Sequence, residues 1–168
     1  MATHPHDRQH FNAAVFIAIR NEKGEYLLQL RQNTSFMNGY WDFAAGGHLE
    51  KGESLQECAV REAQEEAGLT LRTEDLKLIR ILQYDVADSI YPYIDFMFLC
   101  DKFSGEAATN EPNDVGELKW FKPGEFPGKC TVAVRLHEQM NFSEELSFSY
   151  ISHEEHERII GEKFKVEI

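Results

Sequence analysis

The chain has 168 residues, of which 42% are hydrophobic, and this is enough for one domain with a buried core. Its formal net charge is −12 and its lysines and arginines form no cluster, which argues against a surface for a nucleic-acid polymer. The apolar runs have the length of strands and are too short to span a bilayer, and residues 1–10 are too polar for a signal peptide. A cytoplasmic protein without a membrane segment is therefore expected.

Three cysteines, Cys58, Cys100 and Cys130, are widely spaced and form no CxxC pair. This pattern argues against a disulfide framework and against a structural zinc site. We expect three buried thiols without a chemical role.

The first third of the chain predicts strands. Residues 13–19 form a strand, and after the turn signal at residues 21–24 a return strand at residues 25–31 completes a hairpin. A polar loop leads to a short strand at residues 41–44. The pair Gly46-Gly47 is then expected to open a loop that runs to Glu53.

A helix with clear end signals follows. Ser54 suits the N-cap, and Glu57 completes a capping box with it. Residues 55–67 are good helix formers, and Gly68 stands where a helix ends.

The rest of the chain mixes both element types. The expected elements are strands at residues 76–86, 93–100 and 117–121, a helix at residues 132–140, and a short helix from a second capping box at Ser152 to Ile160. No linker or repeat interrupts this order, so a single α/β domain is predicted over residues 1–168, with a core at about 11–142 and a C-terminal extension at 143–168. Helices should cover both faces of a sheet.

Three carboxylates share one face of the first helix. With about 3.6 residues per turn, Glu62, Glu65 and Glu66 lie side by side, and Arg61 lies next to them. Such like charges repel, and a hard divalent cation such as Mg²⁺ would relieve the repulsion. Taken alone, however, the cluster could equally be a solvated acidic face.

The spacing around the cluster decides between these readings. The chain reads Gly47-x5-Glu53-x7-Arg61-Glu62-Ala63-x-Glu65-Glu66-x-Gly68-Leu69. Seven fixed residues would coincide by chance on the order of once in 10⁶ sequences of this length. The segment resembles the complete Nudix box, and the chain around it resembles the MutT-like Nudix hydrolases.

The resemblance implies a Nudix fold, an α/β/α sandwich around a mixed β-sheet. It also implies roles for the box residues. Glu62, Glu65 and Glu66 would be ligands of Mg²⁺, with Mn²⁺ as a substitute, together with the carbonyl of Gly46. Arg61 would position a glutamate, and Glu53 would brace the loop against the helix, so that Glu53, Arg61, Glu62 and Glu65 form the catalytic set. One departure is that Ala45 stands where many relatives have proline, which changes loop stiffness more than chemistry.

Outside the box the assignments are open alternatives. Glu111 is a candidate ligand or base, or an ordinary loop acid. Arg31 resembles a phosphate-contacting position, and Trp41, Phe36 or Tyr40 would either stack on a base or belong to the core.

The implied activity is Mg²⁺-dependent hydrolysis of the diphosphate linkage in a nucleoside diphosphate derivative, such as a nucleoside triphosphate, ADP-ribose or a sugar nucleotide. The alternatives are a nucleotide-sensing Nudix module without catalysis, and an isopentenyl diphosphate isomerase, for which none of the three cysteines has a recognisable context. Selectivity is expected in the loops at residues 32–40 and 85–92 and in the tail beyond residue 142. That tail could cover the pocket or form a homodimer.

Overall fold

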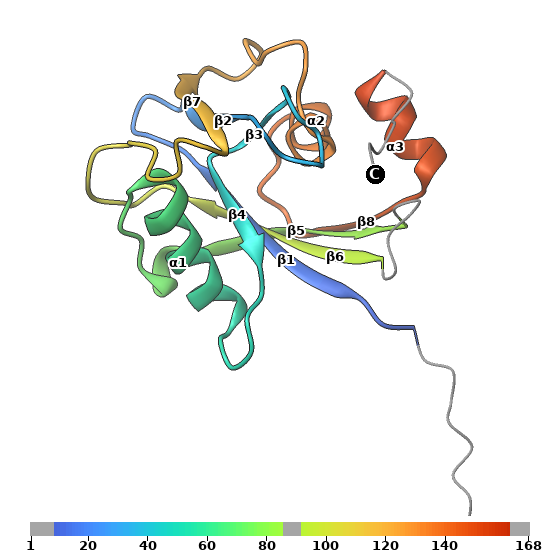
Figure 1. Ribbon diagram of the computed structural model, residues 1–168, viewed down its shortest axis with the longest axis horizontal. Coiled ribbons are helices and arrows are strands. Elements are labelled where there is room, and N and C mark those ends of the chain that lie inside the picture. The colour runs from blue at the N-terminus through green and yellow to red at the C-terminus, as the bar shows by residue number, and fades with distance from the viewer. Residues whose placement is uncertain (1–8, 86–91, 162–168) are drawn as a thin grey trace, which may run out of the picture.

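A computed structural model describes residues 9–85 and 92–161, and within them the strands form two sheets (Figure 1). Sheet A contains, in spatial order, β4 (Ala45–His48), β1 (Asn12–Ile19), β6 (Tyr93–Cys100), β5 (Lys77–Tyr84) and β8 (Ser147–Ile151). Sheet B contains β3 (Trp41–Phe43), β2 (Tyr26–Arg31) and β7 (Val115–Phe121), all paired antiparallel.

Sheet A is mixed. Strand β1 runs parallel to β6 and antiparallel to β4, while β5 runs antiparallel to β6 and parallel to β8. Helix α1 (Leu55–Ala67) covers one face, and α2 (Val132–Gln139) and α3 (His153–Ile160) lie on the other side (Figure 1). The predicted α/β class and sandwich architecture are therefore confirmed.

The two faces of β1 explain the layering. Val15, Ile17 and Ile19 are fully buried in the core beneath α1, whereas Phe16 and Ala18 belong to the core beneath α2 and α3. Because successive side chains of a strand point to opposite faces, an apolar run on both faces produces a strand buried on both sides.

Helix α1 forms where its end signals predict it. The Ser54 hydroxyl accepts a hydrogen bond from the Glu57 N–H, and the Glu57 carboxylate accepts one from the Ser54 N–H, at 3.2 and 2.7 Å. Gly68 ends the helix in the left-handed conformation, at φ 67°, which glycine adopts without strain. The small side chains of Ala59 and Ala63 are fully buried and let the helix approach the sheet closely.

Two local predictions were wrong, and one strand was missed. Strands β1 and β2 do not form a hairpin, because they belong to different sheets. The glycines at 46 and 47 do not open a loop, because their backbones pair with β1 as part of β4, opposite Phe16 and Val15. Strand β8 was not predicted, since its serines and exposed aromatics give it no apolar pattern.

Other sequence features behave as expected. Cys58, Cys100 and Cys130 are buried and free. The hydroxyl of Ser152 caps α3 by accepting from the Glu155 N–H at 3.2 Å, but the predicted second capping box is only half formed, because the Glu155 carboxylate accepts from Arg158 instead of the Ser152 N–H. No helix among residues 9–85 and 92–161 is both long and apolar enough to cross a bilayer.

A buried histidine in α2 predicts acid sensitivity. His137 is fully enclosed, and burial, together with the charges of Arg80 and Arg20 and against that of Glu144, lowers its pKa from 6.5 to about 3. Between these values only the unfolded chain binds the proton, so stability falls as the pH drops below 6.5. His137→Phe should flatten this slope by up to about 1.4 kcal/mol per pH unit in denaturant titrations at pH 4 to 7.

The exposed His153 provides the control, since His153→Phe leaves no buried histidine altered. An equal slope for wild type and His137→Phe would show that His137 is not the group responsible.

Candidate active site

Arg61 gathers the acidic side chains of the box. Its Nη1 donates to Glu62 at 2.7 Å and to Glu65 at 2.9 Å, while its Nε and Nη2 donate to the two oxygens of Glu53 at 3.2 and 2.9 Å. Nη2 also reaches the carbonyl of His48 at 3.1 Å. The planar guanidinium thus ties the end of β4, the following loop and α1 into one frame.

Glu53 is the fixed end of this frame. Its Oε1 also accepts the Glu50 N–H at 2.6 Å, and the hydrogen bonds from Arg61 and then Glu50 lower the pKa of Glu53 to about 2. A carboxylate with two anchors braces the loop, in agreement with the position that the resemblance implies for it.

Glu66 lies in a different environment from Glu65. Its Oε2 accepts the backbone N–H of Gly46 at 2.8 Å and the side chain of Gln29 at 3.3 Å, whereas the Glu65 side chain is 52% exposed. Burial, and the neighbouring charges of Glu62 and other acids, raise the pKa of Glu66 to about 8. The box therefore contains one acid that stays exposed and one that is enclosed against the sheet.

The missing side chain of Gly47 makes room for Glu62. A Cβ at this position would overlap the Glu62 carboxyl group. Burial raises the pKa of Glu62, against the hydrogen bond from Arg61. Glycine is needed at position 47 because a carboxylate occupies the space of its side chain, not because of its backbone conformation.

The loop before β7 brings a further acid to the box. The Asn110 side chain donates to the carbonyl of Gln64 at 3.0 Å and ties this loop to α1. The charge of the next residue, Glu111, contributes to the raised pKa values of Glu62 and Glu66. The structure thus brings Glu111 to the box, as the prediction of a ligand or base at this position requires.

The site has the donor chemistry for a divalent cation. Three carboxylates share the single charge of Arg61, so negative charge is in excess there, and Glu66 and Glu111 lie beside them as further oxygen donors. Within the described ranges no three acid, histidine or cysteine side chains converge as a ready ligand set, because Glu62 and Glu65 turn to Arg61 and Glu66 turns to Gly46. Oxygen donors and uncompensated charge suit a hard ion such as Mg²⁺.

Sequence reasoning missed a buried acid beside Arg31. Asp42 is 3% exposed and accepts hydrogen bonds from Thr131 at 2.7 Å, from the Phe43 N–H at 2.9 Å and from Arg31 at 3.4 Å. Its charge also raises the pKa of Glu66, which places Arg31 and Asp42 next to the box. A charged residue inside the apolar segment at residues 41–44 was the available signal.

The three aromatic residues that were predicted either to stack on a base or to belong to the core have different surroundings. Trp41 packs edge-on against Phe121, with ring centroids 5.0 Å apart, and lies at the margin of the core. Phe36 is 38% exposed, and the Arg31 guanidinium lies 5.9 Å from its ring centroid. Tyr40 contacts Lys129 in the same way at 5.6 Å. Of the three, Phe36 is best placed to contact a substrate held by Arg31.

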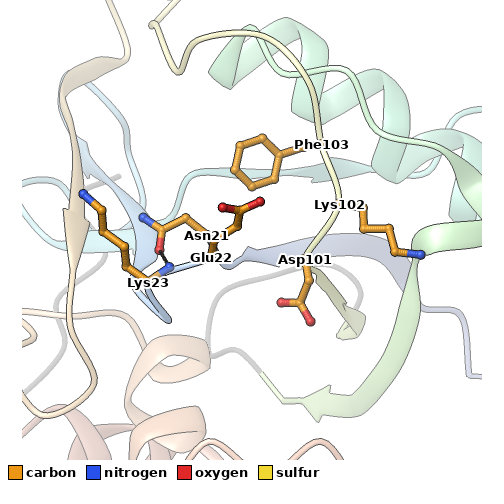
Figure 2. A pocket seen from close by; sticks show the side chains of 6 residues that line it. All are labelled: Asn21, Glu22, Lys23, Asp101, Lys102 and Phe103. Atoms are coloured by element: carbon orange, nitrogen blue, oxygen red, sulfur yellow. Dashed lines mark hydrogen bonds between the residues drawn. The ribbon is translucent and has the colours of Figure 1, made fainter.

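A hollow on another part of the structure lies away from the box. It has a volume of about 500 Å³ and lies between the turn after β1 and the chain after β6 (Figure 2). Its lining residues are Asn21, Glu22, Lys23, Asp101, Lys102 and Phe103. Its two acids and two lysines balance, so it does not offer the positive charge that a diphosphate requires.

The comparison with family models decides the family. The NUDIX domain model matches residues 10–141, most of the chain. The chain belongs to the Nudix family. The Nudix assignment agrees with the Gly47-to-Leu69 spacing, with the arrangement of Arg61 and its glutamates, and with the sandwich of helices around a mixed sheet.

Similar proteins carry the same family name. The uncharacterized Nudix hydrolase YfcD of Escherichia coli is 30% identical over 118 residues, which are 70% of this chain and 62% of that protein. The uncharacterized Nudix hydrolase lmo0368 of Listeria monocytogenes is 43% identical over 58 residues, 34% of each chain. The match with this Nudix chain therefore covers less than two thirds of the length of YfcD and about a third of the length of lmo0368.

Solved structures support the fold. A MutT NUDIX hydrolase from Burkholderia pseudomallei is 25% identical, with a TM-score of 0.71 over 78% of this chain and 98% of that one. The mutator MutT protein from Bacillus halodurans is 22% identical, with a TM-score of 0.68 over 85% and 90% of the two chains. The second likeness shows the fold alone.

The frame around Arg61 predicts a position-sensitive enzyme. Arg61→Lys keeps the positive charge but loses the forked contacts to Glu53 and the simultaneous contacts to Glu62 and Glu65. We expect turnover to fall by roughly 100-fold, the scale of a displacement of about 1 Å at a catalytic group. Steady-state kinetics with Arg72→Lys, a surface arginine, as control would measure this, and equal turnover in both variants would contradict the role.

Proposed function

We propose that this chain is a Mg²⁺-dependent Nudix pyrophosphohydrolase that cleaves the diphosphate linkage of a nucleoside diphosphate derivative. The observation that carries the proposal is the convergence of Glu53, Glu62 and Glu65 on Arg61, with Glu66 held beside them by the Gly46 N–H. The family relatives are named as hydrolases, which supports the same reaction class.

Glu62, Glu65 and Glu66 would hold the ion together with the carbonyl of Gly46 and the side chain of Glu111. When bound, a divalent cation neutralises the diphosphate, disperses the charge that develops during cleavage and lowers the pKa of water. Mn²⁺ has similar donor preferences and would substitute for Mg²⁺.

The protein groups would then position the reactants. A water oxygen attacks one phosphorus in line with the bridging oxygen, the bond from phosphorus to that oxygen breaks, and the leaving phosphate departs with the electron pair. The proton of the water passes to a carboxylate of the box or of Glu111. Arg61 keeps the glutamates in place, and Arg31, fixed beside Asp42, would contact a phosphate oxygen. The products are a nucleoside monophosphate and either pyrophosphate or a phosphorylated remainder.

The substrate is a small nucleotide. The net charge of −12 disfavours a polymeric nucleic acid, and the local cation Arg31 suits a single diphosphate. A cytoplasmic location fits this substrate class.

A nucleotide panel with Mg²⁺ tests the proposal. It contains nucleoside triphosphates including 8-oxo forms, ADP-ribose, UDP- and GDP-sugars and diadenosine polyphosphates, with products separated by chromatography. Cleavage of one class that is lost with EDTA is expected. Folded protein that binds a nucleotide and Mg²⁺ but cleaves no member would instead identify a sensor module.

A further inference from the structure

An acid on β6 is buried without a partner. Asp95 is 6% exposed, its Oδ1 has no hydrogen-bond partner, and no hydrogen bond from the described residues reaches its carboxyl group. Burying a carboxyl group without a hydrogen bond costs several kcal/mol, so evolution retains such a group only where something else compensates. The sequence carries the same signal, since Asp95 interrupts the apolar strand Tyr93–Cys100.

Asp95 lies on the face of sheet A that looks toward α2 and α3. In the sheet register its neighbours are Ala14 on β1 and Leu82 on β5, both of them apolar and buried. These neighbours offer no hydrogen-bond donor. Arg80, two residues from Leu82 on the same face of β5, is also buried, but its two terminal guanidinium nitrogens and the Asp95 Oδ1 all lack a hydrogen-bond partner, so Arg80 does not satisfy this carboxyl group. No side chain described on this face of sheet A therefore compensates Asp95.

The acids between sheets A and B connect this position to the box. Burial raises the pKa of both Glu66 and Asp95, and the charge of Asp42 adds to each shift, so Asp42 lies near both acids. Asp42 pairs across sheet B with Gln29, whose side chain donates to Glu66 at 3.3 Å, and Asp42 also fixes Arg31 at 3.4 Å. A substrate whose diphosphate lay at Glu66 and Arg31 would therefore have Asp42 beside it and Asp95 close to its other end.

Ring side chains connect the surroundings of Arg31 with strand β5, next to Asp95. The ring of Phe36, next to Arg31, has its centroid 6.3 Å from that of His156 on α3. The Tyr84 ring lies 6.5 Å from the same histidine, and the charge of Asp95 raises the pKa of Tyr84. Aromatic faces beside a hydrogen-bonding edge are the features that recognise a heterocyclic base.

We propose that Asp95 determines base specificity, by accepting hydrogen bonds from the ring and amino N–H groups of the nucleobase. The inference rests on the proposed function, because it uses the substrate direction that the box and Arg31 define. Burial disfavours the charged form of Asp95, and two parallel N–H donors would stabilise it as a carboxylate. Guanine presents two adjacent donors on one edge. The favoured substrate class is therefore a guanine-type nucleoside diphosphate derivative.

Nucleoside monophosphates test this site without requiring hydrolysis. Calorimetry would compare guanosine, inosine and unsubstituted purine riboside monophosphates, which present two, one and no donors at the relevant edge. The wild-type protein should bind the guanosine form roughly 10- to 100-fold more tightly than the purine riboside form. Asp95→Leu should remove this difference and leave the affinity for the purine riboside form unchanged.

Two further variants sharpen the test. Asp95→Asn retains one carbonyl acceptor, so it should weaken binding of the guanosine form more than that of the inosine form. Tyr26→Phe removes another buried hydroxyl without a partner, on β2 and away from the box, and should leave the order of affinities unchanged. Replacing a buried acid without a partner by leucine is expected to preserve the fold, which a thermal melt would verify.

The outcomes separate the two claims. Hydrolysis of the nucleotide panel with a base preference that Asp95→Leu does not alter would overturn the inference alone. Binding that depends on donors and on Asp95, without any hydrolysis, would overturn the proposed activity alone. A wild-type protein that binds all three monophosphates equally would also overturn the inference.

Discussion

Glu66→Gln is expected to lower turnover by roughly 10³-fold, the scale of losing one electrostatic stabiliser of a transition state. The amide keeps the shape of the side chain and still accepts the Gly46 N–H, which donates at 2.8 Å. What it loses is the charge that the proposed metal site requires. Kinetics at saturating Mg²⁺ would measure the loss.

The same substitution should make the protein more stable in the absence of metal. Burial, together with the charge of neighbouring Glu62, raises the pKa of Glu66 from 4.5 to about 8, so without metal the fold disfavours the charged form and must take up a proton at neutral pH. The melting temperature of the variant should exceed that of the wild type in EDTA, and added Mg²⁺ should stabilise only the wild type strongly. Glu117→Gln, on the exposed part of β7, serves as control. Full turnover in Glu66→Gln would show that the metal site is wrongly assigned.

Gly47→Ala is expected to reduce turnover by about 100-fold although it removes no functional group. The added methyl would occupy the space of the Glu62 carboxyl, which must move and give up its 2.7 Å contact with Arg61. Since the displaced atoms are the end of a flexible side chain, the cost in stability should be small. Chemical denaturation and kinetics on the same preparation would show the two effects separately.

Gly128→Ala is the matched control for this glycine. No atom lies within 4 Å of a Cβ built at Gly128, so both stability and turnover should stay at wild-type values. A Gly47→Ala enzyme with normal turnover would mean that Glu62 can leave its observed position without consequence for the reaction.

Local signals explain which parts of the fold the sequence predicts. The signals that begin and end helix α1, at Ser54, Glu57 and Gly68, lie within or next to the helix itself, and the helix forms as predicted. The pairing of strands depends on distant partners. The sequence between residues 19 and 26 contains no signal that β1 and β2 belong to different sheets. Gly46 and Gly47 form a strand only because their backbones pair with β1.

The same contrast between local signals and distant contacts applies to the residues of the site. The spacing of the box places Glu62, Glu65, Glu66 and Arg61 on one helix, where periodicity alone brings them together. Asp42 and Asp95 reach the neighbourhood of the box through the stacking of two sheets, which no local pattern encodes. Polar residues inside apolar strands were the only sign of them, and that sign does not tell which distant group each residue faces.

The parallel pairing of β1 with β6 has a consequence for biosynthesis. Residues 12–19 are synthesised well before their partner strand, which ends at Cys100, so a strand that is buried on both faces stays incomplete until β6 has been made. At about 5–20 residues per second this interval lasts several seconds. Contacts this far apart in sequence also form slowly. We therefore expect nascent chains that stop before β6 to depend on chaperones and to aggregate in their absence, even though α1 can already form within them.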